Sequence, residues 1–209
     1  YLKIHVMNRV NNLEGIVSDW SYWDKPYPKS VPRKILARPF QWLPDLVLVV
    51  QGVRRSGKST LLAQIAESRK LPPRRCYFVN FEDPRLSTWL NPALLAQIVK
   101  LSGSGEEESY FFFDEIQEVE EWEKWLHVQV ERPGNRHFII TGSNASLLAG
   151  ELSTALTGRH RTLDVYPFDF EEYQQLKPAH TLEQYLDDGG FPKALQVDDP
   201  PGLLREYFK

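Results

Sequence analysis

One eight-residue loop constrains the fold of this chain more than any other feature. Residues 52–59 read Gly-Val-Arg-Arg-Ser-Gly-Lys-Ser. The loop follows a continuous apolar run at 46–50, of the kind that forms a strand buried on both faces of a parallel sheet. Apolar residues at helical spacing follow it, at Leu61, Leu62 and Ile65. A strand, a glycine-containing turn and a helix in this order predict a loop whose backbone N–H groups surround a phosphate at a helix N-terminus.

The residue types inside the loop fit that role. Its glycines permit close backbone approach and the unusual dihedral angles of a loop wrapped around an anion. We predict that Lys58 reaches the β- and γ-phosphates of a nucleotide and that Ser59 is a ligand of Mg²⁺. The predicted nucleotide-binding residues are Gly52, Arg54, Arg55, Ser56, Gly57, Lys58, Ser59 and Thr60. For the two arginines, contact with a γ-phosphate or a neighbouring subunit and a solvated loop tip are both open. The alternative for the whole motif is a chance match in a Gly/Ser turn.

The alternation of strand and helix recurs along the chain. Apolar or aromatic runs predict strands at 76–81, 110–113, 137–141 and 162–166. Helical spacing predicts helices at 92–101 and 119–130, and a short one at 145–149. Strands that alternate with helices indicate an α/β fold, in which helices cover both faces of a parallel sheet.

The two ends of the chain depart from this alternation. Residues 1–44 contain several prolines and show no strong period, which predicts an irregular arm over the domain surface with a short helix near 32–37. The core is expected over 45–167. After it, predicted helices at 170–176, 182–187 and 203–208 indicate that a small helical module occupies 168–209.

Two carboxylates end the third predicted strand. Asp114 and Glu115 directly follow an apolar run at 111–113. Because ligands of α/β sheets bind at the carboxyl ends of strands, we expect Asp114 beside the phosphates as a Mg²⁺ ligand. Glu115 suits a general base that orients and polarises the attacking water. The alternative is a solvated acidic pair at the start of a helix.

Two further positions carry candidate catalytic groups. Asn144 or Ser143, after the fourth predicted strand, can hydrogen-bond the nucleophilic water or the γ-phosphate, although either can instead cap the following helix. Arg159 is a candidate arginine finger, acting within its own chain or from a neighbouring subunit, with Arg161 as a substitute. A structural salt bridge is the alternative for Arg159.

The composition excludes several classes of protein. A hydrophobic fraction of 42% rules out a predominantly disordered chain, and the single Cys76 excludes a disulfide framework and a cysteine-rich zinc site. No apolar run approaches the ~20 residues that span a bilayer, and the chain opens without a secretory leader, so we expect a cytoplasmic protein without membrane contact. Residues 1–75 hold 14 basic against 5 acidic residues, within a net charge of −3 for the whole chain. This excess suits nucleotide phosphate or nucleic acid, and an accident of surface composition is the alternative.

These stretches resemble the P-loop ATPases of the AAA+ and STAND-related kind, and more closely a prokaryotic, archaeal-ATPase-like group of ATP-binding proteins. The resemblance is carried by residues 52–62, 80–86, 113–117, 140–145, 156–159 and 189–192. It implies a five-stranded parallel core of order 5-1-4-3-2 with a helical lid, and it places Pro192 beside the adenine. It also implies that 168–209 is the lid and the start of a C-terminal region that this chain lacks. The usual lid arginine is missing, with Arg205 a weak substitute.

The hypothesis that follows is Mg²⁺-dependent ATP hydrolysis that drives or gates an attached or partner domain. Glu115 would activate water, while Lys58, Mg²⁺ and Arg159 would stabilise charge in the transition state. One alternative is a nucleotide-dependent switch with little turnover, and another is a nucleic-acid-associated ATPase. Partners in view are ATP or ADP, an unknown protein or C-terminal domain, and further copies of the chain in a homo-oligomer.

Overall fold

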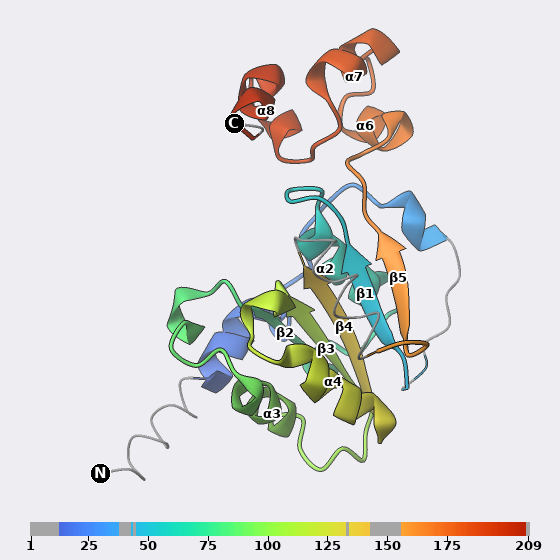
Figure 1. Ribbon diagram of the computed structural model, residues 1–209. Helices are drawn as coiled ribbons and strands as arrows, with labels where there is room; N and C mark the ends of the chain where they lie inside the picture. The colour runs from blue at the N-terminus through green and yellow to red at the C-terminus, as the bar shows by residue number, and fades with distance from the viewer. Residues whose placement is uncertain (1–12, 38–42, 44, 133, 143–155, 208–209) are drawn as a thin grey trace.

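Five parallel strands form one sheet in the computed structural model, which describes residues 13–37, 43, 45–132, 134–142 and 156–207. The strands are β1 (Val47–Gln51), β2 (Cys76–Asn80), β3 (Ser109–Asp114), β4 (Arg136–Gly142) and β5 (His160–Asp164). Their order across the sheet is β2-β3-β4-β1-β5, and every neighbouring pair is parallel (Figure 1). This order is the predicted 5-1-4-3-2 read from the other edge, so the α/β fold and its topology are confirmed.

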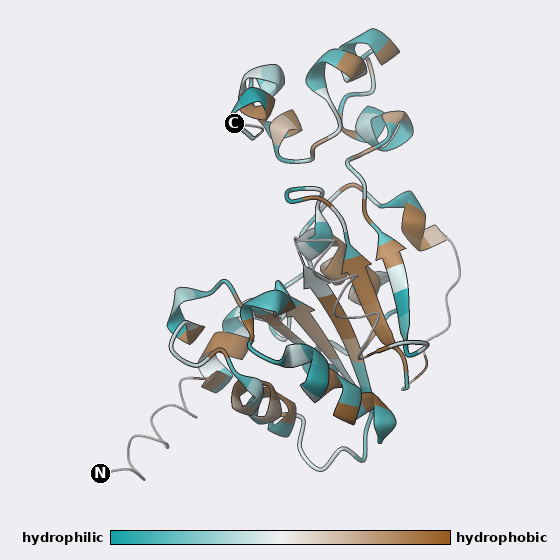
Figure 2. Ribbon diagram, viewed as in Figure 1, coloured by the Kyte–Doolittle hydropathy of each residue, from teal (hydrophilic) through white to brown (hydrophobic). Residues whose placement is uncertain are grey.

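Side chains alternate between the two faces of the sheet, and each face has its own core. Phe111 and Phe113 of β3 join one cluster of buried residues, whereas Phe112 joins the other. Val49 and Leu48 of β1 divide in the same way. Because both faces are covered, β1 to β4 are apolar along most of their length, as the brown strands of Figure 2 show, whereas the edge strand β5 is mostly polar.

Helices cover both faces of the sheet. α2 (Lys58–Ser68) packs on the face of Phe112, while α3 (Pro92–Lys100) and α4 (Trp122–Glu131) pack on the face of Phe111 (Figure 1). The 3-10 turns η2 (Pro73–Arg75), η3 (Pro84–Leu86) and η4 (Ile116–Glu118) connect these elements. α4 begins three residues later than predicted, because η4 and a left-handed Glu121 (φ 50°) take up the intervening chain.

The arm is more ordered than the sequence predicts. Residues 13–20 are helical, and Leu13, Ile16 and Val17 are buried on the face of Phe111. The expectation of an irregular arm is therefore wrong for this stretch, where apolar residues recur at helical spacing. The 3-10 helix η1 (Lys34–Ala37) lies where a short helix is expected.

The arm also protects one edge of the sheet. The backbone N–H of Phe78 in the edge strand β2 donates to Ser21 Oγ (3.0 Å), and Trp23 Nε1 donates to the carbonyl of Cys76 (2.9 Å). Trp23 packs on one sheet face and Tyr27 on the other, so the arm crosses this edge. An edge strand covered in this way cannot pair with another chain.

A helical module, the lid, lies beyond the carboxyl ends of the strands (Figure 1). It contains α6 (Phe170–Leu176), α7 (Leu182–Asp188), η5 (Ala194–Gln196) and α8 (Pro200–Tyr207). Capping boxes at Asp169 and Thr181 start α6 and α7. The small core of the lid includes Val31 of the arm. No helix in the described ranges is both long and apolar enough to cross a membrane.

Candidate nucleotide-binding site

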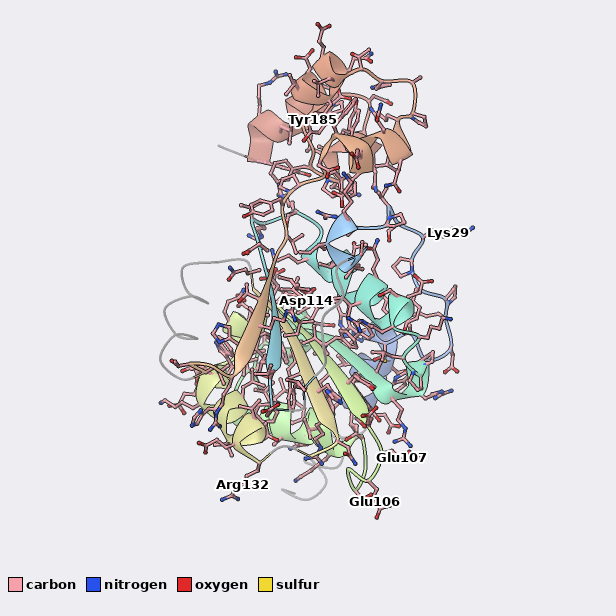
Figure 3. All side chains as sticks on the ribbon, turned by 90° about the vertical axis from the view of Figure 1, so that its right-hand side faces the viewer. Lys29, Glu106, Glu107, Asp114, Arg132 and Tyr185 are labelled. Carbon is pink, nitrogen blue, oxygen red and sulfur yellow. The ribbon has the colours of Figure 1, made fainter. Side chains whose placement is uncertain are left out.

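The predicted site residues meet at the carboxyl edge of the sheet. The loop over 52–57 follows β1, Asp114 ends β3, and Thr141 lies near the end of β4. Figure 3 places Asp114 at the end of the strands that faces the lid, whereas Glu106, Glu107 and Arg132 lie at the opposite end. Parallel strands bring their carboxyl ends together, so residues far apart in sequence form one site.

The loop after β1 is shaped by its two glycines. Gly57 has a left-handed backbone (φ 98°) at the N-terminus of α2, a conformation that favours glycine. A Cβ atom on Gly52 would lie 2.1 Å from the carbonyl oxygen of Val165, so only glycine fits there without a shift of the backbone. The loop therefore presents its N–H groups at the start of a helix, where the helix dipole favours an anion.

Lys58 is buried within this loop. Its Nζ donates to the carbonyl oxygens of Gly52 (3.1 Å) and Val53 (3.2 Å). Burial lowers the pKa of the Lys58 ammonium, while the carboxylates of Glu115 and Asp114 act to raise it. The ammonium thus lies at the centre of the loop and close to both carboxylates.

Asp114 is held by hydroxyl and amide groups from three neighbouring segments. It accepts hydrogen bonds from Thr141 Oγ1, from Ser59 and from Asn80 Nδ2 (3.3 Å). Burial raises the pKa of Asp114, and the bonds from Thr141 and Ser59 oppose that shift. Asp114 and Ser59, the two predicted Mg²⁺ ligands, are therefore in contact.

Hard oxygen ligands of this kind fit Mg²⁺, which typically takes one or two protein ligands together with phosphate oxygens and water. Within the described ranges, no three His, Cys, Asp or Glu side chains come together as a metal cluster. A dedicated all-protein metal site is thus not what the described residues build.

Glu115, the residue after Asp114, has an unusual backbone conformation. Its φ of 55° is left-handed, its N–H donates to Thr141 Oγ1 (3.0 Å), and its Oε2 accepts from Gln117 Nε2 (2.7 Å). Thr141 thus bonds to both carboxylate residues at once. Ser143 and Asn144 were the predicted candidates near the end of β4. Thr141 was not predicted, although a polar residue at the end of an apolar strand could have indicated it.

Two cavities open beside the loop. One of about 360 Å³ is lined by Arg55, Gly57, Lys58, Ser59, Thr60, Glu115, Pro192, Lys193 and Gln196. The other, of about 200 Å³, is lined by Pro28, Lys29, Ser30, Val31, Arg33, Gly57, Thr60, Gln64, Phe168, Leu176, Pro192 and Gln196. Pro192 of the lid and Thr60 of α2 line both. The two cavities are therefore adjacent. Lys58 and Glu115 line the first, while the second combines apolar residues with Lys29 and Arg33.

Comparison with known proteins identifies the family. A family model described as an AAA domain matches residues 45–174. The chain belongs to the AAA domain family. An uncharacterized protein of Haemophilus influenzae is 36% identical to it over 169 residues, which are 75% of this chain and 42% of that protein. An uncharacterized protein of Methanocaldococcus jannaschii, MJ1544, is 32% identical over 185 residues, or 79% of this chain and 40% of that protein. The chain thus spans about two fifths of the length of these relatives.

A solved structure agrees with the fold of this AAA domain. The Walker-type ATPase of Pyrococcus abyssi superposes with a TM-score of 0.50 at 18% sequence identity, over 77% of this chain and 63% of that chain. The resemblance to P-loop ATPases of the AAA+ kind, read from the sequence, is therefore confirmed at the level of family and fold.

The three predicted arginines of the AAA domain lie in different places. Arg54 pairs with Glu82 (2.8 Å) at the surface. The guanidinium of Arg55 lies 3.5 Å from the ring centroid of Tyr207 in α8, so the loop contacts the lid directly. Arg55 also lines the cavity that contains Lys58.

Arg159 lies at the opposite end of the sheet. Its carbonyl accepts from the N–H of Val47, at the start of β1, and its Nη1 is 3.5 Å from Glu131 at the end of α4. The loop follows β1 at its other end, five residues away, or roughly 16 Å at about 3.3 Å per residue. Arg159 therefore lies far from the loop of its own chain, and its action as an arginine finger stays a prediction. Asn144 and Ser143 lie outside the described residues.

Arg33, which was not predicted from the sequence, joins three parts of the AAA domain. This buried side chain donates from Nη1 to the carbonyl of Ser56 in the loop (3.0 Å) and from Nη2 to that of Tyr166 (2.6 Å). Its Nε pairs with Glu172 of α6 (3.0 Å), and its guanidinium lies 5.0 Å from the ring centroid of Phe168. A lone arginine in a proline-rich stretch gave no signal for these contacts.

The excess of basic residues among the first 75 is partly neutralised by ion pairs within the protein. Among the described residues of this stretch, ion pairs with carboxylates include those of five basic side chains. The pairs are Arg33–Glu172, Lys34–Asp169, Lys34–Glu171, Arg54–Glu82, Arg74–Asp24 and Arg75–Glu107. Most partners lie in the acidic remainder of the chain, so the charge asymmetry of the sequence is in part an internal complementarity.

Proposed function

We propose that this AAA domain binds ATP together with Mg²⁺ and hydrolyses it to ADP and phosphate. One observation carries the proposal: Lys58, Ser59 and Glu115 line a single cavity, and Asp114 is hydrogen-bonded to Ser59. These are the groups that phosphoryl transfer to water requires, namely a cation on the phosphates, oxygen ligands for the metal and a base for the water.

Each residue has a distinct task in the proposed reaction. Lys58 exchanges the carbonyl oxygens of Gly52 and Val53 for oxygens of the β- and γ-phosphates. Ser59 and Asp114 are the residues that would hold Mg²⁺, which when bound supplies positive charge next to the phosphate oxygens. Glu115 orients a water molecule toward the γ-phosphorus and accepts its proton, while the bond to the β-phosphate oxygen breaks and ADP leaves.

The second cavity suits the base of the nucleotide. Val31 of the arm and Phe168 and Pro192 of the lid region give it apolar walls next to the loop. A purine ring buried there would contact Pro192, in agreement with the packing that the family resemblance implies for this residue. The arm, the loop and the lid would then all contact one ATP molecule.

A nucleotide-dependent switch is the second candidate function. The observations that favour it are two contacts between loop and lid, Arg55 on Tyr207 and Arg33 between Ser56 and Glu172. A ligand on the loop therefore acts on elements that also position the lid. In this form, nucleotide would set the conformation of an attached or partner domain with slow turnover.

A steady-state phosphate-release assay on wild type and Glu115→Gln separates the two candidates. Multiple turnover that the substitution abolishes supports the enzyme, and nucleotide binding without turnover supports the switch. Calorimetry on Lys58→Ala tests the site itself. Lys58 is the buried cation at the centre of the loop, so its removal should abolish ATP binding. Unchanged affinity in this variant would show that ATP binds elsewhere.

A further inference from the structure

The glutamate assigned as general base has a dedicated hydrogen-bond donor two residues along the chain. Gln117 Nε2 donates to Glu115 Oε2 at 2.7 Å. The contact is possible because Glu115 has a left-handed backbone (φ 55°), which turns the chain sharply into η4 and brings the two side chains together. A left-handed backbone at a residue other than glycine costs energy, and such positions cluster at functional sites.

The turn that carries Gln117 is anchored on both sides. Ile116 (0% exposed) and Val119 (1% exposed) are part of the core on the face of Phe111. The backbone N–H of Glu115 is fixed in addition by Thr141 Oγ1. Gln117 therefore projects from a rigid support, and its amide defines where the carboxylate of Glu115 lies.

The Lys58 ammonium competes with the neutral amide of Gln117 for the carboxylate of Glu115. Lys58 and Glu115 line the same cavity, and the carboxylate of Glu115 acts on the pKa of the Lys58 ammonium. In the part of the chain that the structure describes, no ion pair joins the two. A glutamate without the Gln117 bond is free to turn toward the ammonium, which would remove the base from water and the cation from phosphate.

We propose that Gln117 is a positioning residue that holds Glu115 in the orientation needed to activate water. The inference rests on the proposed function, since it assumes that Glu115 is the base. With Oε2 bound to the amide, Oε1 is left to accept the proton of the attacking water. Misplacement of a catalytic group by about 1 Å can lower a rate by up to ~100-fold, so one hydrogen bond at this position matters.

A double-mutant cycle on the full chain tests the role. Single-turnover ATP hydrolysis is measured for wild type, Gln117→Leu, Glu115→Gln and the double variant, and ATP affinity is measured by calorimetry for each. We expect Gln117→Leu to lower the hydrolysis rate roughly 10- to 100-fold with affinity within about twofold of wild type. In the Glu115→Gln background the same substitution should cause no further loss, because its effect passes through Glu115. Glu118→Ala, an exposed position on the same turn, is the matched control and should hydrolyse ATP like wild type.

Three results would overturn the role of Gln117. The first is a wild-type hydrolysis rate in Gln117→Leu. The second is a rate higher than wild type, which would make the bond a restraint on Glu115. The third is an equal loss of rate in the wild-type and Glu115→Gln backgrounds, which would make Gln117 merely structural. If Glu115→Gln itself hydrolyses ATP at the wild-type rate, the proposed function fails and the role of Gln117 falls with it. The two failures are thus told apart by the Glu115→Gln single variant.

Discussion

Replacing Glu172 with glutamine should destabilise the domain strongly, although the two side chains have the same shape. The carboxylate of Glu172 pairs with Arg33, and the two side chains are 5% and 8% exposed. It also accepts from the backbone N–H groups of Lys34 (2.9 Å) and Asp169 (3.3 Å). Glutamine removes the counter-charge of Arg33. Its amide NH2 group, itself a donor, would also face donors that now bond to the carboxylate, namely Arg33 or the backbone N–H groups of Lys34 and Asp169. Arg33 remains buried as an uncompensated cation.

The expected cost follows from the burial of this pair. Removal of one partner of a buried ion pair costs about 3–5 kcal/mol. For a domain of this length, each kcal/mol lowers the Tm by about 2–4 °C, so Glu172→Gln should melt roughly 6–20 °C below wild type. The assay is thermal unfolding followed by tryptophan fluorescence and circular dichroism.

Asp24→Asn is the matched control, because it also converts one ion-paired carboxylate to an amide. Its pair with Arg74 is exposed, at 72% and 68%, and should contribute at most about 1 kcal/mol. Equal melting temperatures for Glu172→Gln and Asp24→Asn would refute the reasoning. The double variant Arg33→Met with Glu172→Gln should lose less than the sum of the single variants, because it no longer buries an unpaired charge.

Two further predictions test the loop after β1 and the turn η3. Gly52→Ala should destabilise the domain by at least about 1–3 kcal/mol in urea unfolding, because its Cβ would lie 2.1 Å from a carbonyl oxygen, whereas Gly15→Ala, with no atom within 4 Å, should stabilise it by about 0.5–1 kcal/mol. A loss at Gly15 equal to that at Gly52 would contradict the steric argument. The Arg85 guanidinium lowers the pKa of Asp83 from 3.8 to about 2, so the stabilisation that this carboxylate adds is complete above pH 3.8 and is lost as pH falls through about 2. Melting curves between about pH 4 and pH 2 should therefore show a larger loss for wild type than for Asp83→Asn, and parallel curves would exclude this linkage.

The sheet was predictable because its signals are local. Each of the strands β1 to β4 is a short run rich in aromatic or β-branched residues, such as Phe111–Phe113, that only a doubly covered sheet can bury. The loop after β1 was predictable for a similar reason, since its glycines and Lys58 lie within eight residues. The order of the strands came from the family resemblance rather than from these runs, because pairing between distant strands has no local signature.

The parts of the site that escaped prediction depend on partners far away in sequence. Arg33 contacts residues that lie 23, 133 and 139 positions along the chain. Thr141 acts through Asp114 and Glu115, about 27 positions before it, and its role follows only from the register of β3 with β4. The helix over 13–20 did have a local signal, which the prolines after it obscured.

The arm changes how the site can respond to a ligand. A ligand shifts a conformational equilibrium only by its difference in affinity between the two states. Arg33 joins the loop to the lid through Ser56 and Glu172, so contacts within the protein itself hold the lid against the loop. Nucleotide that binds such a preorganised site spends little of its binding free energy on closure. Any larger movement of the lid must break the contacts of Arg33, and the arm therefore sets the threshold that a nucleotide-driven switch in this domain has to overcome.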